Sequence, residues 1–167
     1  MIRYPNLIPE CNVDTAFVEM LGYIDPNHAP DISTVSSILE AKNANQRAIG
    51  FIDNDKKKPK YISQFKVFDN GIGNVKLLKH PAKEQYLVVV HPAMDKFIYD
   101  LCGVLGVNLS HYGFPRELKT FIAFTKRRSI KTDKNFKNLL NTIKQKNPPE
   151  IARIQAWFKQ INFPKIL

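Results

Sequence analysis

Ala48-Ile49-Gly50-Phe51-Ile52-Asp53-Asn54-Asp55 is an apolar run of strand length that ends in two carboxylates. Side chains at positions i and i+2 of an extended segment point to the same side, so we expect Asp53 and Asp55 to converge where this strand ends. Two anions held together repel unless a cation lies between them or one of them takes up a proton. The usual cation is a hard divalent metal ion with oxygen ligands, typically magnesium and often shared with a phosphate. The pattern therefore predicts a phosphate-handling metal site.

A further carboxylate, Glu10, follows a second short apolar segment, Leu7-Ile8-Pro9. Ligands of an open α/β sheet bind beyond the carboxyl ends of its strands. If residues 6–10 and 47–53 form neighbouring parallel strands, Glu10 and the aspartate pair face one crevice. Three carboxylates in that position could hold Mg²⁺ or Mn²⁺ and leave one group free for proton transfer.

The hydrophobic periodicity predicts an α/β fold in which a sheet is followed by helices. Apolar residues at helical spacing are expected to form helices at 14–21 and 33–41, and strand-like runs lie at 65–68, 75–78 and 86–90, with a strong turn at 69–74. Beyond residue 91 the spacing is helical throughout. The expected architecture is a small, mostly parallel, Rossmann-like sheet with a hairpin, in a domain at 1–110, and a basic helical extension at 111–167 packed on it.

The net charge of +10 is concentrated in the last third of the chain. Residues 116–167 hold 13 Lys/Arg and 3 Asp/Glu, whereas residues 1–115 hold 12 of each. Such asymmetry indicates a polyanionic partner, and we expect DNA or RNA, bound through phosphate contacts. The alternative is a solvated lysine-rich surface or, for the basic triplet at 126–128, a helix end that complements the dipole. The residues expected to contact nucleic acid are Lys56, Lys57, Lys58, Lys60, Lys126, Arg127, Arg128 and Lys131.

Several classes of protein are excluded by what the sequence lacks. No basic, apolar and small-residue succession indicates a signal peptide, and the longest apolar runs are too short to span a bilayer. Cys11 and Cys102, 91 residues apart, indicate neither a disulfide framework nor a zinc site. We therefore expect a cytoplasmic protein that does not contact a membrane.

The order of these acids resembles the TOPRIM domain of topoisomerases, primases and the overcoming-lysogenization-defect nucleases. The match is best to small bacterial TOPRIM-like proteins, in which a Glu-Gly-x-Thr-Asp/Glu turn opens the first helix and an Asp-x-Asp ends a later strand. Here the turn is Glu10-Cys11-Asn12-Val13-Asp14, with Cys11 in place of glycine, and the second motif is Phe51-Ile52-Asp53-Asn54-Asp55. A looser match is His91-Pro92-Ala93-Met94-Asp95-Lys96-Phe97, so the resemblance covers roughly residues 5–100.

The resemblance implies a TOPRIM-like fold and metal-dependent phosphodiester chemistry. Asp53 and Asp55 would ligate Mg²⁺, and Glu10 would ligate a metal or act as the general acid or base. Asp95, in the looser match, is a further candidate ligand. The lysines at 56–60 would neutralise a bound backbone. With one or two metal ions stabilising the attacking and leaving oxygens, the expected activity is that of a nuclease.

Other interpretations stay open at this point. Asp53-Asn54-Asp55 ahead of lysines also fits a solvated turn, or the site of a nucleotide-sugar or small phosphate-ester enzyme. A non-catalytic TOPRIM-like subunit of a bacterial defence system, acting with a protein partner or as a homo-oligomer, would have the same charge distribution. Asp14 and Asp95 fit carboxylates that stabilise helix N-termini, and His91 fits a structural histidine.

Overall fold

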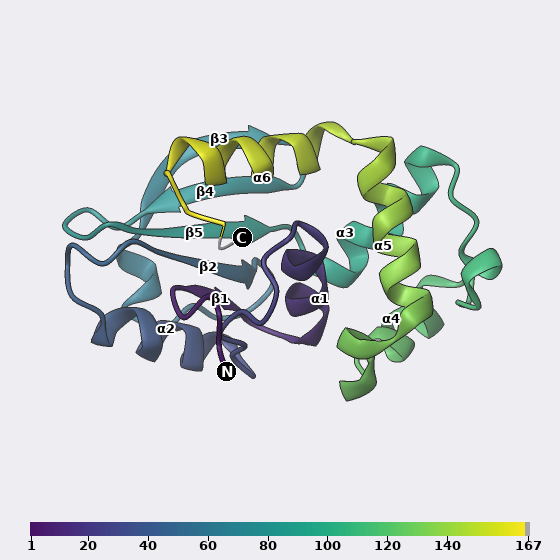
Figure 1. Ribbon diagram of the computed structural model, residues 1–167, viewed down its shortest axis with the longest axis horizontal. Coiled ribbons are helices and arrows are strands. Elements are labelled where there is room, and N and C mark those ends of the chain that lie inside the picture. Colours follow the sequence, from purple (N-terminus) through teal and green to yellow (C-terminus); the bar gives the residue numbers. More distant parts are fainter. Residues whose placement is uncertain (166–167) are drawn as a thin grey trace.

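The computed structural model describes residues 1–165 and shows a five-stranded mixed sheet surrounded by helices (Figure 1). The strands lie in the order β1-β2-β5-β4-β3. Strands β1, β2 and β5 are parallel, and β4 and β3 add to them as an antiparallel hairpin. The predicted fold class is therefore confirmed. The bounds are β1 (Leu7–Pro9), β2 (Ala48–Asp53), β3 (Lys66–Ile72), β4 (Val75–Lys79) and β5 (Gln85–Val90).

The helices cover both faces of the sheet and the end at which the parallel strands finish. Helix α6 runs along β3 and β4, α2 covers the opposite face, and α3, α4 and α5 lie beyond the arrowheads of β2 and β5 (Figure 1). The α-helices are α1 (Asn12–Met20), α2 (Ile32–Ala41), α3 (Met94–Leu105), α4 (Leu118–Thr125), α5 (Lys134–Lys146) and α6 (Pro149–Gln160). Short 3₁₀ helices are η1 (Ile62–Gln64), η2 (Leu109–Tyr112) and η3 (Arg128–Thr132).

Strand β2 is buried on both faces and divides the core into two clusters. Ile49 and Phe51 point into a cluster built with α1, α3, α5 and α6, whereas Ala48 and Ile52 point into a cluster built with α2 and η1. This alternation follows from the pleat, which sends successive side chains to opposite faces. A continuously apolar strand is the pattern that a parallel strand covered by helices on both sides requires.

The start of α1 is set by a cap that the helical spacing did not indicate. Cys11 is the N-cap, and its Sγ accepts a hydrogen bond from the backbone N of Asp14 at 3.4 Å. The helix therefore begins at Asn12, ahead of the expected 14–21. Helices α2 and α5 begin after conventional aspartate caps, with Asp31 accepting from Thr34 N at 2.7 Å and Asp133 from Phe136 N at 2.8 Å.

The C-terminal helices share the larger core cluster with the sheet. Phe158 of α6 packs on Phe51 of β2, with ring centroids 6.0 Å apart. The Trp157 indole donates to Asp69 Oδ2 of β3 at 3.0 Å. The C-terminal helices thus pack on the sheet, and the division into a domain at 1–110 and an extension at 111–167 stays a prediction. None of the described helices combines the length and the apolar character needed to cross a membrane.

Gly50 leaves room on β2 for the side chains of α2 and β5. A Cβ added there would lie 2.8 Å from Leu87 Cδ2 and 3.1 Å from Val35 Cγ1. We expect Gly50→Val to destabilise the protein by about 1–3 kcal/mol in urea unfolding, because the core has no space for the added methyl groups. Gly103→Ala is the control, since a Cβ on this residue of α3 meets nothing within 4 Å and should stabilise by about 0.5–1 kcal/mol. Equal stability of the Gly50→Val variant and the wild type would contradict this account of the packing.

Candidate metal centre

The parallel pairing of β1 and β2 brings Glu10 and Asp53 together. Pro9 pairs with Phe51 in the register, so the chain emerges from both strands at the same edge of the sheet. The backbone N of Asp53 donates a hydrogen bond to Glu10 Oε2 at 3.0 Å. Glu10 and the first aspartate therefore lie together at one edge of the sheet.

Helix α1 adds a third carboxylate, Asp14, to this pair. Because α1 begins directly after Glu10 and Cys11, Asp14 lies in its first turn and faces back toward the strand ends. Ligand oxygens of Glu10, Asp14 and Asp53 all lie within 4.8 Å of one another. The three side chains are buried, with residue exposures of 0%, 1% and 7%. We call these three residues the acidic cluster.

The protein neutralises or hydrogen-bonds only part of the negative charge in the acidic cluster. The Lys56 ammonium pairs with Glu10 Oε1 and lies 4.0 Å from Asp53 Oδ2. Asp53 Oδ1 accepts a hydrogen bond at 2.9 Å from the backbone N of Met94, the first residue of α3. Asp14 Oδ2, by contrast, is buried and has no hydrogen-bond partner within residues 1–165. An unmet oxygen of this kind is costly unless a proton or a cation satisfies it.

Burial and mutual repulsion change the acidity of the cluster. Desolvation and the neighbouring Glu10 charge raise the pKa of Asp53 to about 7, from an ordinary value of 3.8. The pKa of Asp14 is also raised, by burial and by the charges of Asp53 and Glu10. For Lys56, burial lowers the pKa, but the hydrogen bond and charge of Glu10 together with Asp53 raise it overall. At neutral pH the metal-free cluster is thus partly protonated.

The donor set fits a divalent metal ion. Carboxylate oxygens are the ligands of hard cations such as Mg²⁺, Mn²⁺ and Ca²⁺, and the unpartnered Asp14 oxygen offers a free coordination site. Cys11 lies beside the cluster, but its thiol serves as the cap of α1. Burial and the Asp14 charge raise the pKa of that thiol, which keeps it protonated.

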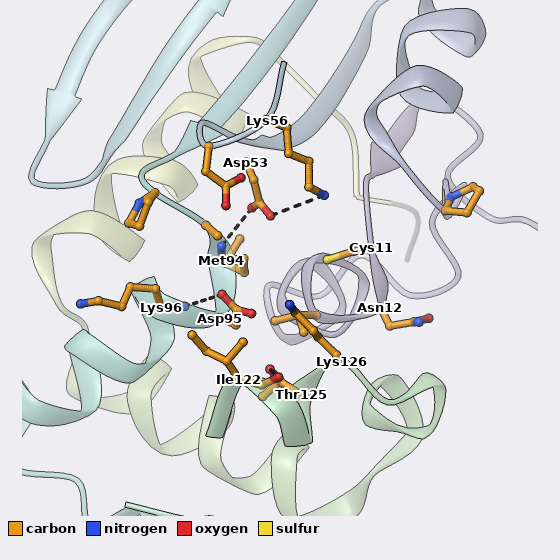
Figure 2. A pocket seen from close by; sticks show the side chains of 15 residues that line it. Cys11, Asn12, Asp53, Lys56, Met94, Asp95, Lys96, Ile122, Thr125 and Lys126 are labelled. Atoms are coloured by element: carbon orange, nitrogen blue, oxygen red, sulfur yellow. Dashed lines mark hydrogen bonds and ion pairs between the residues drawn. The ribbon is translucent and has the colours of Figure 1, made fainter. Parts of the chain in front are cut away.

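A cleft of about 510 Å³ opens beside the acidic cluster (Figure 2). Asp53 and Lys56 line one wall, and the start of α1 and the start of α3 line others. Figure 2 shows the Lys126 side chain extending from the end of α4 into the cleft, whereas Lys96 extends away from the acids. Lys96 pairs with Asp100 at 2.6 Å. Glu10 and Asp14 do not line the cleft, so Asp53 is the member of the cluster that reaches it.

The other acids expected at the site lie at the cleft but outside the cluster. Asp55 is exposed, because β2 ends at Asp53 and the alternation that would place both carboxylates side by side stops there. Asp95 lines the cleft in the first turn of α3, where its Oδ1 accepts from Lys96 N at 2.7 Å. Asp14, which the helix-dipole interpretation explained as well, takes the third place in the cluster. The signal for it was the spacing of Glu10 and Asp14 across a helix start.

The predicted nucleic-acid-binding residues are divided among different surroundings. Lys56 belongs to the acidic cluster and Lys126 lines the cleft, whereas Arg128 and Lys131 line a neighbouring hollow. Arg127 instead stacks on the Phe124 ring, 4.2 Å from its centroid. In the loop after β2, Lys58 Nζ donates to Asn54 Oδ1 at 3.1 Å, and neither Lys57 nor Lys60 lines the cleft. That these residues bind nucleic acid stays a prediction.

Comparisons with protein-family models, with curated proteins and with solved structures found no match to this chain. The resemblance to TOPRIM domains stays a prediction from the motifs around Glu10 and Asp53. The geometry itself establishes a buried cluster of three acids that could hold a metal ion, beside a cleft with Lys126 on its far side.

The raised pKa of Asp53 has a consequence for stability without metal. A carboxyl group whose pKa is higher in the folded than in the unfolded protein stabilises the fold at low pH, and this contribution is lost as pH rises through the folded value. In EDTA, we expect the wild type to lose on the order of a few kcal/mol between about pH 4 and pH 8. Asp53→Asn should flatten this dependence in urea unfolding measured across the range.

Asp31→Asn is a suitable control for the pH dependence. Hydrogen bonds from Thr34 lower the pKa of Asp31 below 3.8, so this variant should shift stability by a constant amount above about pH 5. A wild type whose stability does not fall with pH, or an Asp53→Asn variant with the same slope as the wild type, would show that the cluster is not protonated as described.

Lys56 provides a test of the cluster as a cation site. Its ammonium occupies the position next to Glu10 that an entering metal ion needs, and like charges repel. We expect Lys56→Met to bind Mn²⁺ on the order of tenfold more tightly than the wild type in isothermal titration calorimetry. Lys57→Met, which removes an exposed charge next in sequence, is the matched control and should change affinity little. Weaker binding by Lys56→Met would mean that the ion binds elsewhere.

Proposed function

We propose that this protein is a TOPRIM-like nuclease that cleaves phosphodiester bonds in nucleic acid with Mg²⁺ or Mn²⁺. The observation that carries the proposal is the buried cluster of Glu10, Asp14 and Asp53 beside a cleft that Asp53 lines and whose far wall carries Lys126. Phosphodiester chemistry needs two components: carboxylates that bind a hard cation, and nearby basic residues that attract phosphate.

Each acid has a distinct part in this proposal. Glu10, Asp14 and Asp53 would hold the metal ion, which when bound supplies a Lewis acid for a phosphoryl oxygen and an acidified water. Asp53 would lie nearest the substrate, since it is the cluster residue that lines the cleft. Asp55 and Asp95, on the cleft wall, would orient the attacking water or take part in a second metal site. The resemblance of the motifs around Glu10 and Asp53 to those of TOPRIM nucleases supports the same assignment.

The electrostatic arrangement favours a polymeric anion over a small one. Lys126 makes no ion pair within residues 1–165, and it lies where α4 leads into the basic segment at 126–131. A mononucleotide would use the cleft alone, whereas a polynucleotide would extend beyond it toward these further cations. Counterion release from several phosphates would then add to the affinity.

The position of Lys56 favours a second candidate function, that of a non-catalytic binding or regulatory subunit. An ammonium paired with Glu10 reduces the charge of the cluster without any metal ion. In that case the basic segment would bind nucleic acid while the acids serve only to hold α1 against the sheet. Metal-dependent cleavage decides between the two functions.

We expect the wild type to nick plasmid DNA or to cleave labelled single-stranded DNA or RNA when Mg²⁺ or Mn²⁺ is present. Asp53→Asn and Glu10→Gln should each reduce the rate at least ~100-fold, because each removes a metal ligand. Asp25→Asn alters an exposed carboxylate outside the cleft and should retain the activity. Binding of Mn²⁺ without cleavage of any of these substrates would favour the non-catalytic function, and cleavage inhibited by mononucleotides alone would favour small phosphate esters.

A further inference from the structure

A second hollow of about 440 Å³ adjoins the cleft at the start of α1. The two share Cys11, Asn12 and Pro30 as a common wall. On its other sides the hollow is lined by a histidine and two cationic residues, His28, Arg128 and Lys131. We call it the basic hollow. Whereas Asp53, Asp55 and Asp95 line the cleft, no carboxylate of residues 1–165 lines the basic hollow.

The short helix η3 fixes both cations on one side. A 3₁₀ helix has three residues per turn, so Arg128 and Lys131, at positions i and i+3, lie above one another. Ile130 between them is buried at 1% exposure and anchors η3 in the core with α1. The two charges are therefore held by packing and do not depend on a neighbouring acid for their position.

These cations are available to a ligand. Within residues 1–165, neither Arg128 nor Lys131 forms an ion pair, and Lys131 interacts with Glu19 only through space. An arginine and a lysine that converge on a hollow are suited to phosphate, because a guanidinium binds two oxygens at once and an ammonium adds a point charge.

His28 offers a different kind of contact. The Thr15 hydroxyl donates to Cys11 O at 2.8 Å, so in its contact of 2.8 Å with His28 Nδ1 the histidine must be the donor. The neutral ring then has its proton on Nδ1 and an acceptor at Nε2. Such a nitrogen suits a sugar hydroxyl or a base N–H better than a phosphate oxygen.

We propose that the basic hollow binds a backbone phosphate of the same nucleic-acid strand whose reacting phosphate lies in the cleft. The identity of the reacting phosphate rests on the proposed function, whereas the hollow itself is defined by Arg128, Lys131 and His28. The strand crosses the N-terminal turn of α1 at Cys11 and Asn12, the wall common to both spaces. A nuclease of this design engages an extended strand rather than a single nucleotide.

The test is binding in EDTA, where no cleavage takes place. Fluorescence anisotropy with labelled single-stranded DNA and RNA of about 12 nucleotides should show that Arg128→Glu/Lys131→Glu binds at least ~10-fold more weakly than the wild type. The double variant Lys146→Glu/Lys159→Glu changes the net charge equally but lies outside both spaces, and it should lose less than ~3-fold. The neutral variant Arg128→Gln/Lys131→Gln should lower the slope of log affinity against log salt by about 1 to 2.

The outcomes are separable from those of the nuclease test. Equal losses in the two charge-reversed variants, an unchanged affinity of Arg128→Glu/Lys131→Glu, or no binding by the wild type would each overturn the proposal. A thermal unfolding curve confirms that the variants are folded, and the neutral variant serves if the charge-reversed one is not. If binding follows the expected pattern but no cleavage occurs with Mg²⁺ or Mn²⁺, the hollow stands and the proposed function fails. Comparison of the two probes shows whether DNA or RNA is preferred.

Discussion

Three carboxylates buried within 4.8 Å of one another impose the main electrostatic constraint on this fold. Two unit charges at that separation repel by about 3 kcal/mol at an effective dielectric constant of about 20. The single ammonium of Lys56 can neutralise one of the three acids, and it is paired with Glu10. The remaining charge has to be removed by protons, which is why the pKa values of Asp14 and Asp53 are raised, or balanced by a metal ion. A site of this kind is costly to fold when empty and is therefore suited to bind a cation.

The topology of the fold places helix N-termini where they partly compensate the buried negative charge. Parallel β1 and β2 end at one edge, and the helices that follow Glu10 and β5 begin there, so the N-termini of α1 and α3 both face the cluster. Helix N-termini carry partial positive charge and unpaired backbone N–H groups. Asp14 lies in the first turn of α1, and Asp53 binds the first backbone N of α3. The same arrangement would be unavailable to an antiparallel pair, whose strands end at opposite edges.

How far the sequence predicts this site depends on which geometric rule applies at each acid. Glu10 follows the buried strand β1 and Asp53 ends the buried strand β2, and the rule that neighbouring parallel strands end at one edge of the sheet was sufficient for both. Asp55 was expected beside Asp53 because extended segments alternate, but the strand ends at Asp53 and the rule ends with it. Asp14 could be recognised only by knowing where α1 begins. That point is set by a cysteine cap, whereas serine, threonine, aspartate and asparagine are the residues from which a helix start is normally predicted.

The fold is predictable for a related reason. Strands β2 and β5 are apolar except for Asp53 at the end of one and Gln85 at the start of the other, which leaves little choice but burial between two layers of helices. The packing of the C-terminal helices was harder to predict. Their apolar stripes show that each helix buries one face, but not which element that face packs against. The contact between Phe158 and Phe51, for example, is visible only in the tertiary structure and not in the local sequence. The basic residues are a similar case, because the sequence shows how many there are but not where their side chains lie in the fold.

The position of η3 determines where the positive charges of Arg128 and Lys131 lie on the molecule. Of the basic residues in the last third, Arg153 is turned to the hairpin and pairs with Asp69, whereas Arg128 and Lys131 are carried to the start of α1 by the packing of Ile130. Arg128 and Lys131 lie near the acidic cluster but outside it, and both facts matter. A cation that pairs with the cluster, as Lys56 does, competes with a metal ion for the carboxylates, whereas a cation that lines only the neighbouring hollow would attract phosphate without that competition. Acids at the strand ends and cations beyond the wall of α1 can therefore coexist, and under the proposed function this separation would let one surface bind both a metal ion and a polyanion.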